Sequence, residues 1–169
     1  MPIPLDLQEV VEALESAAEE HTYYLDKRTV EIVLLTNEDL EAAEEDELIS
    51  EYPDWQRESI LKAREVLGSS ADNFLSLPDR GDIYEYQIME DFGREFANRA
   101  IGERLLRLIK GSGAFGRFKH EIFSLGIEED WFSFKRNRLE EIAIEWLDEH
   151  HILYSRRDDE DVDGTRLDV

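Results

Sequence analysis

Hydrophobic residues near the start of the chain recur every three or four positions, which is the spacing of one helix face. The set consists of Leu7, Val10, Val11, Leu14, Ala17 and Ala18. Asp6 stands where its side chain can cap a helix, and Glu9 follows three residues later, as in a capping box. The first predicted element is therefore an amphipathic helix.

The pattern then changes to two runs rich in β-branched and aromatic residues, on either side of residues 26–28. Asp26 suits the first position of a turn, so these runs predict a β-hairpin over residues 22–35. An isolated hairpin is only marginally stable in water, so its apolar side chains need a helix or a third strand to pack on. We expect the packing residues to be Tyr24, Val30, Ile32 and Leu34. The short apolar run from Phe74 to Leu77, ended by Pro78, is the candidate for the third strand.

The rest of the chain has helical spacing. Thr36 and Asp39 have the arrangement of a capping box, and Pro53 and Gly68 delimit a further helix. Asp82 can cap a helix whose apolar residues fall four apart, and it opens a helical region over residues 82–152.

A glycine-containing turn, Gly111 to Gly113, interrupts this helical region, and the helical spacing then resumes. The last and clearest predicted helix covers residues 128–151. Together these patterns predict an α+β fold, mainly helical, with a small antiparallel hairpin or sheet near the N-terminus. We expect a single domain over residues 1–155, followed by an acidic tail, residues 156–169, whose lack of aromatic residues predicts disorder.

The composition narrows the classes of function. Asp and Glu number 42 against 19 Lys and Arg, giving a net charge of −23, so direct binding to DNA or to anionic membranes is unfavourable. The absence of cysteine excludes disulfides, thiol nucleophiles and thiolate metal sites. No apolar run has the length of a membrane span, and the first residues lack the pattern of a signal peptide, so we expect a cytoplasmic protein.

The most acidic stretch, residues 38–51, contains eight acids and no base. It is the candidate surface for a basic protein partner, and its alternative interpretation is an ordinary solvated helix face. The candidate partner-binding residues are Glu38, Asp39, Glu41, Glu44, Glu45, Asp46 and Glu47.

Residues 94–119 reverse the sign of the charge, with seven bases against two acids. Amide groups at the start of the helix after the glycine turn, with basic side chains nearby, form a candidate anion site. Its residues are Arg107, Lys110, Ser112, Gly113, Arg117 and Lys119. The alternative is that the glycines only make a tight turn and that the arginines pair with acidic helices.

Known catalytic and cofactor motifs do not fit this chain. The glycines at positions 111, 113 and 116 have the spacing of a dinucleotide fingerprint, but they follow a helix instead of a strand. A P-loop is excluded because Arg117 and Phe118 replace its Lys and its Ser or Thr. We expect no catalytic residue, no cofactor and no metal site.

Several short motifs resemble the bacterial protein family UPF0158. They are YYLD at residues 23–26, LPD at 77–79, a YxxMEDF-like helix at 86–92, GxGAFxRFK at 111–119 and IAIEWL at 142–147. The chain differs from the family pattern in residues 52–73, in the acidic tail and at Gly116. The resemblance implies a soluble bacterial or phage-related protein, and it brings no established activity or catalytic residue.

The leading functional hypothesis is a non-enzymatic interaction protein. Its acidic stretch would bind a basic protein partner, and its glycine turn would offer a second, anion-facing site. The alternative is a nucleotide- or RNA-binding module, or an enzyme acting on phosphorylated substrates, that uses residues 107–119 with Phe115 or Phe118 stacking on a base. A third hypothesis is a DNA mimic, which requires carboxylates in rows near phosphate spacing.

Overall fold

The computed structural model describes residues 3–45, 48–68 and 71–157. The chain forms two compact units: unit 1 contains residues 1–80 and 143–169, and unit 2 contains Gly81–Ile142. The single domain over residues 1–155 stays a prediction. Most of the predicted disordered tail, from residue 158 onward, lies outside the described residues.

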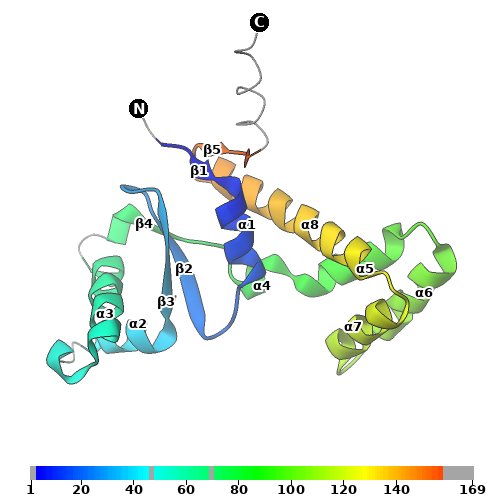
Figure 1. The fold of residues 1–169 in the computed structure, drawn as a ribbon, viewed down its shortest axis with the longest axis horizontal. Helices are drawn as coiled ribbons and strands as arrows, with labels where there is room; N and C mark the ends of the chain where they lie inside the picture. The colour runs from blue at the N-terminus through cyan, green and yellow to red at the C-terminus, as the bar shows by residue number, and fades with distance from the viewer. Residues whose placement is uncertain (1–2, 46–47, 69–70, 158–169) are drawn as a thin grey trace, which may run out of the picture. The chain divides into compact units, whose positions relative to one another are not determined.

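The fold class is α+β and mainly helical, with a small antiparallel sheet, as the sequence predicts (Figure 1). In the sheet of unit 1, β2 (His21–Asp26) and β3 (Glu31–Thr36) form the predicted hairpin. The predicted third strand is β4 (Phe74–Ser76), which pairs antiparallel with the other side of β2. The strand order is therefore β3-β2-β4.

The helices that follow the hairpin begin where the sequence predicts. The hydroxyl of Thr36 accepts a hydrogen bond of 3.2 Å from the backbone N–H of Asp39 and caps α2 (Asn37–Glu44). A short 3-10 helix, η1 (Ile49–Glu51), precedes α3 (Asp54–Leu67). A second one, η2 (Ala71–Asn73), leads into β4.

One face of the sheet packs against α2 and α3. The buried members of this cluster are Leu35, Ala63, Val66 and Phe74, and the half-buried members are Tyr24, Val33, Leu40 and Ala43. This result corrects the expected packing of β3, because Leu35 is 1% exposed whereas Leu34 is 48% exposed. Successive strand residues point to opposite faces, so an error of one position exchanges the buried and the exposed sets.

The two ends of the described chain meet in unit 1. A two-residue strand, β1 (Leu5–Asp6), pairs in parallel with β5 (Tyr154–Ser155), a contact that the sequence pattern did not predict. Asp6 caps α1 (Leu7–Glu15) by accepting a hydrogen bond from the backbone N–H of Gln8, as predicted. The helix ends three residues before the expected Ala18.

The helices around unit 2 follow the predicted order with one break. The region begins with α4 (Arg80–Ile83) and α5 (Glu85–Glu95), separated by Tyr84 in a left-handed conformation with φ 50°. The expected capping role of Asp82 is therefore wrong, because Asp82 lies inside α4. The helices α6 (Arg99–Leu108), α7 (Ala114–Ser124) and α8 (Glu128–Glu149) follow, and residues of α8 from Ala143 onward belong to unit 1.

The core of unit 2 is aromatic. The ring of Phe92 on α5 lies 5.2 to 6.2 Å, between centroids, from four other rings. These rings are Phe96, Phe118, Trp131 and Phe134. Tilted and edge-to-face contacts of this kind add to the free energy gained from burial alone. No helix in the described ranges has the length and apolarity needed to cross a membrane.

Candidate functional site

Four of the predicted acidic residues lie exposed on α2 and at its C-terminal cap: Glu38, Glu41, Glu44 and Glu45. Asp39 differs, because it is only 5% exposed and its Oδ1 accepts a 3.4 Å hydrogen bond from Nε2 of Gln56 on α3. The other two predicted residues, Asp46 and Glu47, lie outside the described residues.

The acidic side chains of α2 have no basic neighbour on their own helix. Within the described parts of the chain, Glu38, Glu41 and Glu44 take part in no ion pair. The three positions follow one another at a spacing of three, so their carboxylates lie on neighbouring parts of the helix surface. This surface can attract a cationic group.

The predicted glycine turn joins α6 to α7. Gly111 and Gly113 have φ values of 82° and 77°, a left-handed conformation that residues with a Cβ adopt only at a cost. Gly113 is the N-cap of α7. The prediction that a glycine turn separates two helices here is therefore confirmed.

The guanidinium of Arg117 forms hydrogen bonds within this turn. It donates to three backbone carbonyls: Nε to Leu108 at 3.0 Å, Nη2 to Lys110 at 2.6 Å, and Nη1 to Ser112. These carbonyls belong to the last turn of α6 and to the loop after it, where no intrahelical donor is available. Arg117 thus closes the end of α6.

Other bases of the segment pair with acids inside unit 2. Nε of Arg104 lies 2.8 Å from Oε1 of Glu121, and Arg94 pairs with Glu90 one helical turn earlier. In the part of the chain that the structure describes, three of the predicted anion-binding residues are exposed and make no ion pair: Arg107, Lys110 and Lys119. Ser112 and Gly113 contribute turn backbone.

A pocket of about 370 Å³ lies elsewhere in unit 2, along α5 and α6. It is lined by Gly93, Arg94, Phe96, Ala97, Arg99, Glu103 and Leu106. None of the six predicted anion-binding residues lines this pocket.

The buried carboxylate of Asp26 is a feature that sequence reasoning missed. The residue is 1% exposed and accepts hydrogen bonds from the backbone N–H, Nε and Nη2 of Arg28 at 3.0, 3.1 and 3.1 Å. Nζ of Lys62 lies 3.9 Å away, and the cationic groups of Arg28 and Lys62 both lie over the ring of Phe74. The hydrogen bonds from Arg28 hold the pKa of Asp26 below its ordinary value.

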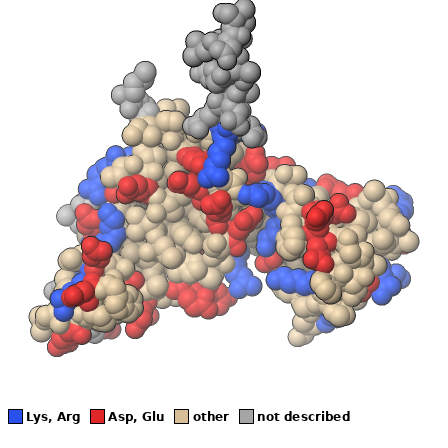
Figure 2. Space-filling model, viewed as in Figure 1, with Lys and Arg blue, Asp and Glu red and all other residues tan. Residues whose placement is uncertain are grey.

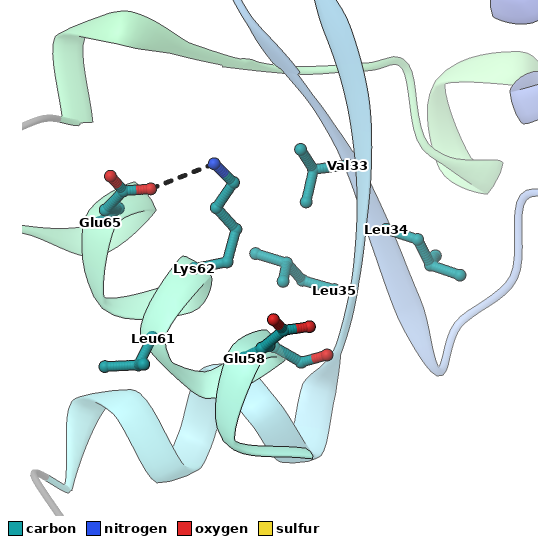
Figure 3. A pocket seen from close by; sticks show the side chains of 8 residues that line it. Val33, Leu34, Leu35, Glu58, Leu61, Lys62 and Glu65 are labelled. Carbon is teal, nitrogen blue, oxygen red and sulfur yellow. Dashed lines mark hydrogen bonds and ion pairs between the residues drawn. The ribbon is translucent and has the colours of Figure 1, made fainter. Parts of the chain in front are cut away.

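A second missed feature is a groove of about 610 Å³ between β3 and α3 (Figure 3). Its lining residues are Val33, Leu34, Leu35, Glu58, Ser59, Leu61, Lys62 and Glu65. Figure 3 shows Val33 and Leu35 pointing toward α3, and Leu34 pointing to the other side of the strand. Nζ of Lys62 lies 3.2 Å from Oε2 of Glu65, so charged groups border an apolar floor.

The sequence predicts the two elements that form this groove, but it does not predict the groove itself. The hairpin and the helix after Pro53 are both predictable, but which strand forms the edge of the sheet depends on where β4 pairs. Among the described residues, no group of three or more His, Asp or Glu side chains is arranged to hold a metal ion.

The comparisons with known proteins agree with the resemblance seen in the sequence. The profile of UPF0158, described as an uncharacterised protein family, matches residues 1–169. The UPF0158 protein PA5073 of Pseudomonas aeruginosa is 22% identical over 157 residues, which cover 92% of this chain and 89% of that protein. No solved structure matches the chain. Because the family profile spans the whole sequence, the chain belongs to the UPF0158 family.

Proposed function

We propose that this chain is a non-enzymatic interaction protein that binds a basic protein partner through the acidic surface of α2. The observation that carries the proposal is the set of exposed carboxylates on one short helix without a base, Glu38, Glu41 and Glu44, together with Glu45 at its C-terminal cap. Lys and Arg side chains of a partner would relieve the mutual repulsion of these carboxylates. Electrostatic attraction of this kind accelerates encounter and selects partners by charge.

The position of two of these acids supports a role outside folding. Glu44 and Glu45 lie at the C-terminal end of α2, where the helix dipole disfavours negative charge. Acids at that end of a helix lower its stability by a few tenths of a kcal/mol to about 1 kcal/mol each. Helix stability therefore does not account for their position, and a benefit in partner binding would.

The nucleotide- or RNA-binding alternative has weaker support. Phe118 is fully buried and cannot stack on a base, and Arg117 uses its donors on backbone carbonyls. Exposed bases remain at Arg107, Lys110 and Lys119, and they keep an anion-facing role open as a secondary proposal. On the face drawn in Figure 2, basic side chains lie among the acidic ones, so an arrangement of carboxylates in phosphate-like rows is not what we propose. A cytoplasmic location stays a prediction.

The proposal is tested with a ten-residue oligolysine peptide as the basic probe. The test variant combines Glu38→Lys, Glu41→Lys and Glu44→Lys, and binding is measured by isothermal titration calorimetry at low and at physiological salt. The matched control combines Glu9→Lys, Glu12→Lys and Glu15→Lys on α1, three exposed acids with the same spacing and the same change in net charge. We expect the α2 variant to lose salt-sensitive binding and the α1 variant to retain most of it. Equal losses in both variants would show that only net charge matters and would refute a dedicated surface.

A further inference from the structure

The outer edge of β3 has no strand beside it in the described ranges, because the sheet order is β3-β2-β4. The backbone bonds of β2 show which residues of β3 face this edge. The N–H of Leu77 donates to the carbonyl of Tyr23, and the N–H of Lys27 donates to the carbonyl of Asn73. The backbone N–H and C=O groups of Tyr23 and Lys27 therefore point toward β4. Because this direction alternates along a strand, the backbone groups of Thr22 and Tyr24 point toward β3.

The pairing register carries this alternation across to β3. Tyr24 lies opposite Val33 and Thr22 opposite Leu35, so Val33 and Leu35 bond to β2. The backbone N–H and C=O groups of Ile32 and Leu34 consequently point outward. An edge with outward-pointing backbone groups is a template on which another strand can pair.

The groove described above runs beside this edge. Its lining comes only from β3 and α3, with no residue of β2 or β4, so it borders the outside of the sheet. Leu34 lines the groove although its side chain points to the opposite side of the strand (Figure 3), which places its backbone at the groove wall. A free strand edge next to a helix, with an apolar floor between them, is the geometry in which extended peptides add to a sheet.

We propose that an extended segment of the basic partner binds in this groove by adding a strand to the outer edge of β3. The inference rests on the proposed function, and it specifies how part of the partner is held. Apolar side chains of the segment contact Val33 and Leu61, and its Lys or Arg side chains reach Glu58.

Charge selects this occupant over two others. The two elements that form the groove carry exposed acids at Glu31 on β3 and Glu58 on α3, while the one lysine of the groove lining, Lys62, is paired with Glu65 and Asp26. A second copy of this chain would bring the same acids to the same edge, and like charges brought together disfavour the complex. The acidic sequence of residues 158–169, with six acids and one base, has the same sign of charge as the groove and is disfavoured for the same reason.

The experiment selects peptides from a phage-displayed library of random twelve-residue sequences against the full chain. We expect the selected peptides to alternate apolar residues with Lys or Arg. Their affinity is then measured for wild type and for Leu34→Pro, which removes an outward N–H without removing a bond to β2. The matched control, Leu34→Ala, shortens the side chain and keeps the N–H. Circular dichroism verifies that both variants are folded.

The inference predicts that Leu34→Pro weakens binding by about tenfold or more and that Leu34→Ala retains nearly all of it. Amide hydrogen exchange adds a direct readout, because the peptide should protect the amides of Ile32 and Leu34. Peptides that bind Leu34→Pro as tightly as wild type, or a selection that yields no such peptides, would overturn strand addition. The oligolysine result with the α2 variant would still decide the proposed function separately. A dimer of this chain that Leu34→Pro dissociates would also overturn the inference, since the edge would then serve self-association.

Discussion

The guanidinium of Arg28 reaches back two residues and donates from Nε and Nη2 to the two carboxylate oxygens of Asp26, each over 3.1 Å. The backbone N–H of Arg28 adds a third hydrogen bond, of 3.0 Å, to Oδ1. Because the carboxylate is almost completely buried at the start of the hairpin turn, these bonds replace the water that it loses on folding. The arrangement ties the turn to the sheet.

This relationship predicts how stability depends on pH. The pKa of Asp26 is lower in the folded state than its ordinary value of about 3.9, so its contribution is present above that value and is lost as pH falls through the folded pKa. Asp26→Asn should lower the free energy of unfolding by about 2 kcal/mol at neutral pH. The difference between wild type and variant should shrink in acid. Urea unfolding at several pH values measures it, and a difference that stays constant below pH 4 would contradict the assignment.

The close approach of α5 and α6 predicts a steric effect at Gly102. A Cβ at this position would lie 2.3 Å from the carbonyl oxygen of Gly93, which is too short for any contact between these atoms. Gly102→Ala should therefore separate the two helices and lower the free energy of unfolding by about 1–3 kcal/mol. The control is Gly116→Ala in α7, where a Cβ meets nothing within 4 Å and should raise the stability by about 0.5–1 kcal/mol. Urea unfolding of both variants should show opposite signs.

The capping role of Arg117 predicts that its loss affects stability. Arg117→Ala leaves the carbonyls of Leu108, Lys110 and Ser112 without this donor, and the free energy of unfolding should fall by about 1 kcal/mol. Arg117→Lys should restore little of this stability, because a single ammonium group cannot reproduce the several N–H donors of the planar guanidinium. Lys119→Ala serves as the control and should change the stability by less than about 0.5 kcal/mol. If Arg117 were instead an exposed ligand group, its substitution would be as neutral as that of Lys119.

The hairpin turn contains a strained residue whose replacement should stabilise the protein. Val30 has φ 60°, a left-handed conformation that is unfavourable for a β-branched side chain. Val30→Gly removes this strain and should raise the free energy of unfolding by about 0.5–1 kcal/mol. Thr29→Gly is the control, because Thr29 does not have a positive φ and gains only flexibility in the unfolded state. The midpoint temperature of thermal unfolding should rise for Val30→Gly and fall for Thr29→Gly.

Local patterns in the sequence were sufficient for most of the elements. Residue spacing and turn residues within short segments predict four of them: the helix capped by Asp6, the hairpin, the strand at Phe74 and the glycine turn. The exception at Tyr84 shows the limit, because a helical period of four continues across a residue that the structure holds in a left-handed conformation. Periodicity reports the favoured side of a helix and does not report where the chain must turn to pack.

The candidate sites also combine features that the sequence predicts with features that only the fold shows. The excess of acids on α2 is a property of composition, so it could be predicted without coordinates. The hydrogen-bond partners of Arg117 could not be predicted from its charge, because they are backbone carbonyls that only the folded turn brings to it. The burial of Asp39 likewise depends on the packing of α3, which brings Gln56 beside it.

The sequence by itself therefore determined the class of fold, the order of most of its elements, the family and the sign of the net charge, because each depends on residue type and on neighbours along the chain. The tertiary structure alone decided which face of β3 is buried, which strand is the edge, and which charged groups pair. The physical reason is that these properties depend on distances between residues far apart in sequence, such as Lys62 and Asp26.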